Sequence, residues 1–291
     1  ISSERVEALR QVARLWQDRG ATERALTVWG RLLEACPDDR DALTEMIALR
    51  ESLGETDAAC ALLASLADLD RREDDLQAAA ASLERLIALD PQSADAHARL
   101  ADVLVETGRP LEAARRLQTL GDIREKAGDR PGALAALERA VQIAPDDAPL
   151  RERLFDVLER DGFRERAANE AVSLCRLLLR QGERERARSV AARVAPLIGE
   201  TLAETLALAR VLIEGGEREA ALAGVLTLLD ALESAKRWPE TIQATDGALA
   251  LFPDEVRLLA ARFRALHASG GVREAVAEGR RLARALAERG N

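Results

Sequence analysis

The chain of 291 residues contains no tyrosine and has only three tryptophans and four phenylalanines, so aromatic residues make up 2% of it. Apolar residues nevertheless account for 47% of the chain, and alanine supplies much of that share. Few aromatics and much alanine favour closely packed helices that meet through small side chains. The sequence also lacks any strand signal.

Long apolar runs are missing as well. No stretch of 18 apolar residues, no signal-peptide core and no basic amphipathic start is present. The three cysteines, Cys36, Cys60 and Cys175, are odd in number and lack metal or redox spacing, which favours a reducing compartment. We therefore predict a cytoplasmic protein without a membrane span, with Cys175 as a core residue.

The scarcity of histidine limits the possible chemistry. His97 and His267 are the only histidines, and no histidine pair at helical spacing, no CxxC pair and no phosphate-binding glycine loop occurs. Carboxylates are numerous, but acid–base catalysis needs two of them in a dry cleft with separated pKa values. The sequence predicts no catalytic residue, no metal site and no cofactor, and hence no enzyme.

The stretch from Gly128 to Asp147 contains the signals of one complete helix. Gly128 can adopt the positive φ that ends a preceding helix, Asp129 can cap the next one, and Pro131 suits its first turn. Pro145 ends the helix. The apolar residues between these signals lie three and four positions apart and form one face: Ala133, Leu134, Leu137, Ala140 and Val141.

The same signals recur every 54 residues. Each glycine of one series is followed five residues later by alanine: Gly54, Gly108, Gly162, Gly216 and Gly270. A second junction carries Gly20, Gly128 and Gly182, with Asp74 and Lys236 in its two remaining places. Prolines stand at positions 37, 91, 145 and 253, with Gly199 in the missing place. Self-similarity of this kind indicates a repeat protein.

Each period of 54 residues is long enough for three helices. In the first full unit we predict them at residues 40–53, 56–72 and 75–89. The units are a partial one at 1–39, full ones at 40–93, 94–147, 148–201 and 202–255, and a partial one at 256–291. Because each repeat unit packs only on its neighbours, we predict one continuous domain spanning residues 1–291.

Two stretches follow a known spacing of apolar, glycine, alanine and proline residues. One consists of Leu9, Val12, Ala13, Trp16, Ala25, Trp29 and Pro37, and the other of Leu117, Leu120, Gly121, Arg124, Ala133, Leu137 and Pro145. The chain in this respect resembles the tetratricopeptide repeat. It departs from that family at Arg124, Thr241 and Gly199, and its period exceeds the family's period of about 34 residues by roughly one helix.

The resemblance implies an all-α, right-handed, two-layer α-solenoid. At about 18 residues per helix and turn, the chain holds about 16 antiparallel helices. Three helices per period place equivalent helices alternately in the two layers. Trp16 and Trp29 occupy positions of packing aromatics, so we expect both in the core.

Charge is distributed unevenly along the chain. Residues 40–93 carry 5 basic and 12 acidic side chains, net −7, and residues 202–255 carry 4 and 10, net −6. Residues 148–201 carry net +2, and residues 256–291 carry net +5. The whole chain has net charge −9, which gives little support for binding nucleic acid. The expected partner is therefore a protein or peptide.

Four residues are candidates for contact with that partner. Trp238 precedes Pro239 at a helix start, where it is either exposed to a partner or packs on Ile242 as a hydrophobic staple. Arg280, Arg281 and Arg284 form either a solvated face or a docking patch for an acidic partner. Forty of the 42 basic residues are arginine, a bias typical of a GC-rich bacterial genome, and we interpret most of them as solvated helix faces.

Two functions remain open. The first is a protein–protein interaction scaffold whose groove holds a protein or peptide segment, as part of a larger protein. The second is a ligand- or peptide-sensing regulatory module of a multidomain regulator. Some tetratricopeptide proteins bind a C-terminal carboxylate through a Lys/Asn clamp, but this chain has only Asn169 and Asn291, so we expect no such clamp.

Both chain ends fall at predicted helix boundaries. Ile1 aligns with the residue after the Gly54 junction, and Gly290 aligns with Gly128. We interpret the chain as a piece of a longer array in which Leu282, Ala283 and Leu286 form an open apolar strip. This interpretation predicts weak end-to-end self-association.

Overall fold

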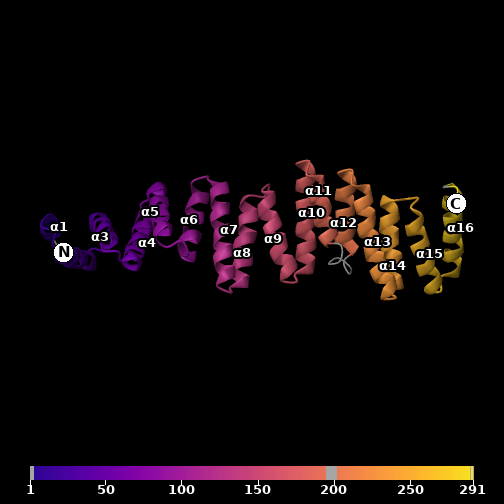
Figure 1. Cartoon of the computed structure of the whole chain (residues 1–291), viewed down its shortest axis with the longest axis horizontal. Helices are drawn as coiled ribbons and strands as arrows, with labels where there is room; N and C mark the ends of the chain where they lie inside the picture. The colour runs from indigo at the N-terminus through magenta and orange to yellow at the C-terminus, as the bar shows by residue number, and fades with distance from the viewer. Residues whose placement is uncertain (1–2, 195–201, 289, 291) are drawn as a thin grey trace. The chain divides into compact units, whose positions relative to one another are not determined.

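The computed structural model describes residues 3–194, 202–288 and 290, so Ile1, Gly199 and Asn291 lie outside the described residues. Sixteen α-helices contain 83% of these residues, and no strand occurs among them (Figure 1). The helices are α1 Ser3–Asp18, α2 Thr22–Ala35, α3 Arg40–Ser52, α4 Thr56–Arg72, α5 Leu76–Leu89, α6 Ala94–Glu106, α7 Pro110–Lys126, α8 Arg130–Ile143, α9 Ala148–Arg160, α10 Arg164–Arg180, α11 Arg184–Val194, α12 Leu202–Glu214, α13 Arg218–Ser234, α14 Trp238–Leu251, α15 Val256–Ala268 and α16 Val272–Glu288. The predictions of an all-α repeat fold and of about 16 helices are confirmed.

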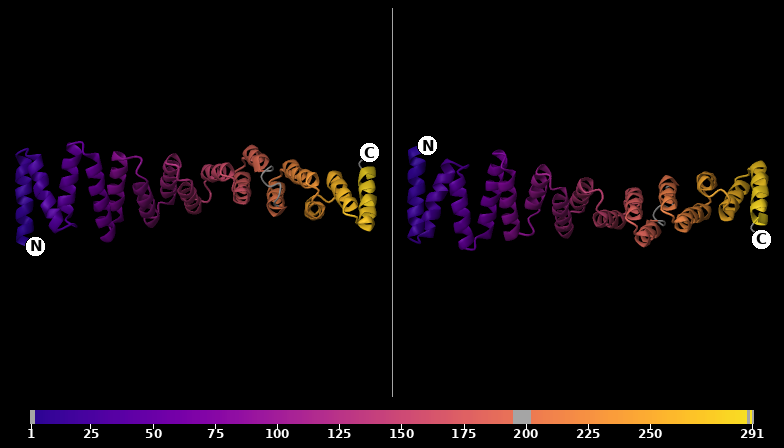
Figure 2. Two further views of the ribbon diagram at one scale, coloured as in Figure 1. Left: turned by 90° about the horizontal axis from the view of Figure 1, so that it is seen from below. Right: turned by 90° about the horizontal axis from the view of Figure 1, so that it is seen from above.

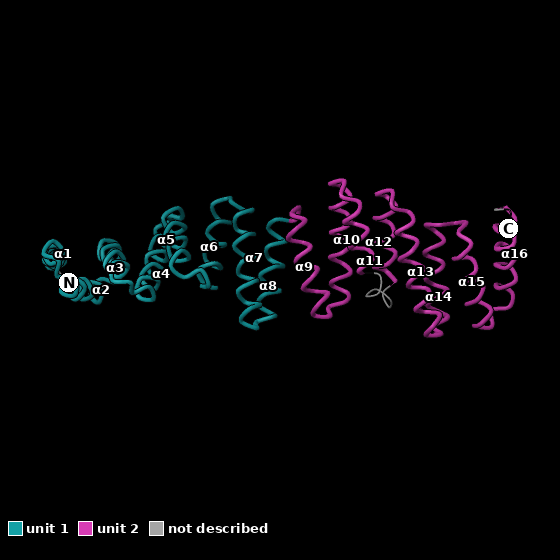
Figure 3. Tube along the Cα trace, viewed as in Figure 1, with its two compact units in different colours: residues 1–144 teal, residues 145–291 magenta. Residues whose placement is uncertain are grey.

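The chain forms two compact units, residues 1–144 with helices α1–α8 and residues 145–291 with helices α9–α16 (Figure 3). Short turns join successive helices wherever the structure describes the connection (Figures 1 and 2). In the first unit every helix packs on the helix that follows it. In the second unit α10 packs on α9, α11 and α12, and the later helices pack in sequence.

Helix lengths repeat with the predicted period. Helices α3, α4 and α5 have 13, 17 and 14 residues, and α6, α7 and α8 have the same three lengths. In the second unit α12, α13 and α14 again have 13, 17 and 14 residues. The first full unit places its helices at Arg40–Ser52, Thr56–Arg72 and Leu76–Leu89, within one residue of the predicted boundaries.

The junctions between helices depend on left-handed backbone conformations. Gly128 has φ of 80° after α7, and the Asp129 carboxylate accepts a hydrogen bond from the backbone N–H of Gly132 to cap α8. Asp74 and Lys236, which replace glycine at the equivalent junctions, also have positive φ, 63° and 55°. The left-handed turn is therefore conserved even at the two junctions that lack glycine.

The first unit buries two contiguous apolar clusters. Trp29 and Leu32 of α2 are fully buried in one of them, and Leu83 of α5 and Leu100 of α6 are buried in the other. Trp29 is a core residue, as expected. Trp16 is only half-buried, and the Arg24 guanidinium lies 4.7 Å from the centre of its ring.

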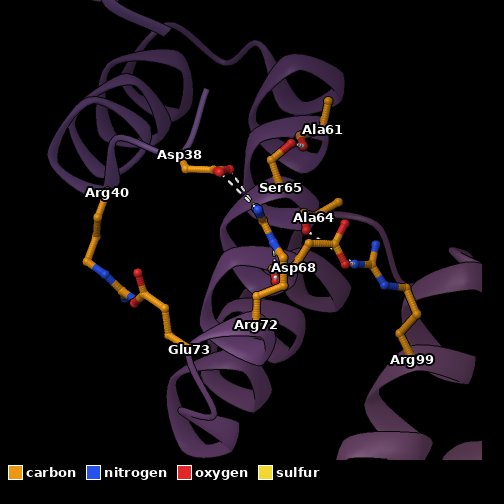
Figure 4. Close-up of polar contacts among 9 residues, drawn as sticks. All are labelled: Asp38, Arg40, Ala61, Ala64, Ser65, Asp68, Arg72, Glu73 and Arg99. Atoms are coloured by element: carbon orange, nitrogen blue, oxygen red, sulfur yellow. Dashed lines mark hydrogen bonds and ion pairs between the residues drawn. The ribbon is translucent and has the colours of Figure 1, made fainter. Parts of the chain in front are cut away.

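Arginine–carboxylate pairs connect a helix with the second helix before it or with the turn that follows that second helix. In Figure 4, Arg72 at the end of α4 donates to both oxygens of Asp38, just before α3, at 2.9 and 2.6 Å. Arg99 of α6 donates to the Ala64 carbonyl of α4 at 3.3 Å and pairs with Asp68. Each exposed pair contributes about 0–1 kcal/mol, so only a series of them stabilises the array appreciably.

The second unit repeats this arrangement. Arg186 of α11 pairs with Glu152 of α9 at 2.5 Å, 34 residues away, and Arg264 of α15 pairs with Glu233 of α13 at 3.0 Å. A separation of 34 residues also joins Arg72 to Asp38. These contacts therefore follow the two-helix step of a tetratricopeptide repeat, about 34 residues, although helix lengths follow the three-helix period.

Candidate interaction surfaces

The three arginines of the predicted cluster lie on α16, but they differ in their contacts. Arg281 donates a hydrogen bond to the Pro253 carbonyl at 2.7 Å and lies 3.9 Å from Glu278. Arg280 and Arg284 are exposed and have no ion-pair or hydrogen-bond partner among the described residues. Two of the three guanidinium groups are thus free for a partner, and the third connects α16 to the turn between α14 and α15.

Arg273 joins the two free arginines. It is exposed, equally without a partner in the described part of the chain, and lies seven residues before Arg280, which itself lies four before Arg284. Spacings of seven and four place the three side chains in one line along a helix. Arg273 was not among the contact residues predicted from the sequence, although these spacings are visible there.

Apolar side chains lie beside this basic line. Val272 is 69% exposed and Val276 is 51% exposed. We use the name α16 face for Val272, Arg273, Val276, Arg280, Ala283 and Arg284, all of which are exposed. A helix surface with adjoining apolar and cationic stripes can bind an amphipathic segment with acidic side chains.

The strip of Leu282, Ala283 and Leu286 is less open than expected. Leu282 and Leu286 are half-buried, and only Ala283 is exposed. The large exposed apolar side chains of α16 are instead Val272 and Val276.

Trp238 is the first residue of α14 and is half-buried. Its neighbour Arg237 donates to Glu240 at 3.2 Å within the same first turn. Packing on Ile242 and contact with a partner both stay predictions for Trp238.

A second surface feature, a cavity, lies in the other half of this unit. Side chains of α11, α12 and α13 enclose a volume of about 230 Å³ that is partly open to solvent. Buried residues of α12 form its floor: Thr205, Leu208, Ala209 and Leu212. Ala191 of α11 and Gly224 of α13 line its walls, and Arg188 of α11 stands at the rim.

The repeat explains why this cavity exists. Position 191 corresponds, at steps of 54 residues, to Trp29 and Leu83, both buried in the first unit. Position 209 corresponds to Ile47 and Phe263, and position 224 to Leu62 and Arg116. Small residues therefore coincide at three positions that hold large side chains in most other units, with Ala101 and Ala8 as exceptions. A Cβ atom added at Gly224 would meet nothing within 4 Å.

The charged side chains at the cavity rim pair with one another. The Arg188 guanidinium donates to the Glu217 carboxylate at 2.5 Å and to Glu185 at 2.9 Å. The hydrogen bond from Arg188 holds the pKa of Glu217 below its ordinary value. Because Arg188 already has two carboxylate partners, the rim offers no free positive charge to an anionic ligand.

The histidine and buried cysteine occupy the core. His97 of α6 is buried, its Nε2–H donates a hydrogen bond to the Pro91 carbonyl at 3.2 Å, and burial lowers its pKa. Cys175 is fully buried, as predicted, and burial raises the pKa of its thiol to about 12. Such a thiol is a poor nucleophile.

Neither a metal-binding group nor a membrane-spanning helix is found where the structure describes the chain. Over residues 3–194, 202–288 and 290, no three His, Cys, Asp or Glu side chains are grouped to hold a metal ion. The helices described there are too short or too polar to cross a membrane. The absence of catalytic, metal and cofactor sites stays a prediction.

Comparison with known proteins supports the repeat. Residues 70–126, from the end of α4 to the end of α7, match the family described as tetratricopeptide repeat. No curated protein matches the sequence. The predicted resemblance to the tetratricopeptide repeat is confirmed.

Several solved structures are similar to this chain at low sequence identity. A double mutant of MamA RS-1 is 19% identical, with 62% of this chain and 98% of that chain covered and a TM-score of 0.24. The signal transduction ATPase with numerous domains from Pyrococcus horikoshii, which has a tetratricopeptide repeat sensor, is 15% identical, with 85% and 42% covered and a TM-score of 0.34. The tetratricopeptide domain of P58(IPK) is 15% identical, with 95% and 92% covered and a TM-score of 0.23.

Proposed function

We propose that the chain is a protein-binding repeat module and that the α16 face docks an acidic, amphipathic segment of a partner protein. Tetratricopeptide repeats generally mediate protein–protein interaction, and residues 70–126 match that family. One observation supports the α16 face as the docking site. Arg273, Arg280 and Arg284 lie in one line, without partners in the described chain, beside two exposed valines.

The physical case rests on both stripes of the α16 face. Each exposed ion pair contributes only about 0–1 kcal/mol, so three of them do not suffice for stable binding. Burial of Val272 and Val276 adds the apolar contribution, roughly 25 cal/mol for each Å² removed from water. The arginines then favour acidic partners, accelerate association and make affinity fall as salt rises.

A synthetic peptide can test this proposal. The probe is an amphipathic helix as long as α16, 17 residues, with leucines in a heptad pattern and glutamates beside them. Fluorescence anisotropy gives its affinity for the protein at about 50 and 300 mM salt. We expect the triple variant R273E/R280E/R284E to bind at least about tenfold more weakly at low salt, since three attractive pairs become repulsive.

A matched control separates the site from overall charge. The variant R31E/R115E/R210E changes net charge equally, at exposed arginines on three different helices that have no partner among the described residues. It should bind the peptide nearly as well as the parent protein. Equal weakening in both variants, or an affinity that ignores salt, would remove the α16 face as the docking site.

A further inference from the structure

The cavity between α11, α12 and α13 is large enough for an organic ligand. Its volume is about 230 Å³. An engineered apolar cavity of about 150 Å³ binds benzene in another protein. This cavity therefore has room for one or two fused rings, and its walls are mostly alanine, glycine and leucine side chains.

Equivalent positions in the chain show which groups fit such surroundings. The indole of Trp29 is fully buried at the position that corresponds to Ala191. A phenyl ring, that of Phe263, stands at the position that corresponds to Ala209. Helical surroundings of the same repeat thus accept aromatic rings where this cavity has only methyl groups.

Arg188 at the rim favours an aromatic ligand over an aliphatic one. Its guanidinium is neutralised by Glu217 and Glu185, but a paired guanidinium can still stack on a ring face. The chain repeatedly uses this contact, with Arg24 4.7 Å from the ring centre of Trp16 and Arg193 4.7 Å from that of Phe155. The electrostatics of the rim therefore complement a neutral ring and offer nothing to an anion.

From these three observations we infer that the cavity binds a small, neutral aromatic molecule of about the size of indole. The site involves α11–α13 and none of the residues of the α16 face, so it is independent of the proposed protein contact. An occupied cavity gives the module a ligand-dependent state, which corresponds to the second of the two functions left open by the sequence.

Calorimetric titration and saturation-transfer NMR with indole test the inference on the complete chain. Benzyl alcohol and cyclohexylmethanol form a matched pair in which only aromaticity changes, and benzyl alcohol should bind more tightly. N-acetyl-tryptophanamide presents the same indole as a peptide side chain. We expect free indole to bind at least as well as this larger probe.

Two variants fill the cavity in different ways. Ala191→Leu supplies the side chain found at the equivalent Leu83, and Gly224→Leu supplies the one found at Leu62. Either should weaken indole binding at least about tenfold, because the ligand and the new side chain compete for one volume. Ala203→Leu, on the exposed side of α12, is the matched control and should leave binding unchanged.

Several outcomes would overturn the inference. These are no binding of indole at millimolar concentration, equal binding by all three leucine variants, and tighter binding of cyclohexylmethanol than of benzyl alcohol. Binding of N-acetyl-tryptophanamide without binding of indole would assign the cavity to a partner's side chain instead. Circular dichroism of each variant shows that lost binding is not lost folding, and Gly224→Leu serves if Ala191→Leu fails to fold.

Discussion

The structure shows that arginine side chains are both exposed and engaged in contacts between helices. The sequence indicated solvated helix faces, and the Arg72 and Arg264 side chains are indeed exposed. Arg264 also binds Glu233 of α13, two helices earlier, and Arg72 binds Asp38 of the turn before α3 with two parallel hydrogen bonds. A planar guanidinium can form such a pair, whereas the ammonium group of lysine cannot.

At the same scale, His97 makes stability depend on pH. Burial lowers its pKa in the folded state, an effect strengthened by Arg116 and opposed by the Pro91 hydrogen bond and by Asp90. The unfolded chain binds a proton near pH 6.5. The stabilising contribution of neutral His97 is therefore complete above about pH 6.5 and is lost as pH falls below that value towards the folded pKa.

We predict that His97→Leu flattens this dependence. Leucine stands at the equivalent positions 43 and 259, so the substitution suits the repeat. The free energy of unfolding, measured by urea titration between about pH 7 and 5.5, should decline in the parent protein and decline less in the variant. His267→Leu, which removes an exposed histidine, should keep the decline. Parallel curves for the parent and for His97→Leu would contradict the prediction.

At the scale of helices, equivalent positions provide a test of packing. Leu83 of α5 fills the place that Ala191 leaves empty in α11. We predict that Leu83→Ala lowers the free energy of unfolding by roughly 2–5 kcal/mol, because it removes a buried side chain and leaves a cavity. The converse change, Ala191→Leu, should raise that free energy by about 0.5–2 kcal/mol.

Denaturant unfolding of the two variants checks this pair. The two substitutions exchange the same two residue types in opposite directions at equivalent positions. Intrinsic differences between leucine and alanine, such as helix propensity, therefore affect the two variants with opposite sign. If Ala191→Leu destabilised the protein as much as Leu83→Ala, the space beside Ala191 would be too small for a leucine. The cavity would then also be too small for the ligand that we infer.

Helix existence and boundaries were largely predictable because local signals determine them. Glycine after a helix, aspartate before the next and apolar spacing of three and four all act over a few residues, as at Gly128 and Asp129. Asp74 and Lys236 were recognised as departures, but only the structure shows that they adopt the same left-handed turn. Residue type alone does not reveal that the surrounding helices impose it.

The candidate sites were less predictable because they depend on contacts between helices. The sequence identified Arg280 and Arg284 but grouped them with Arg281, since proximity in sequence does not show that Arg281 binds the Pro253 carbonyl. The cavity required comparison of positions 191, 209 and 224 across the repeat. Those columns were readable from the sequence, but which of them meet in space was not.

At the scale of the whole molecule, charge and repeat organisation are the remaining features. Residues 256–291 carry net +5 and contain the α16 face, whereas residues 202–255 carry net −6. An acidic partner is therefore attracted to one part of the sequence and repelled by its neighbour, which favours a defined orientation on binding.

We predict that residues 1–291 form one continuous array, as the unbroken 54-residue period indicates. Each of the two compact units has its own buried core, so residues 1–144 and 145–291 expressed separately should both show strong helical circular dichroism. In an array, however, stability is a sum of repeat and neighbour-interface contributions, and separation removes one interface. Each half should therefore unfold at a lower urea concentration than the intact chain, whose single transition should also have the larger m-value because more surface is exposed at once. Two transitions in the intact chain that coincide with those of the separate halves would instead show two independent domains.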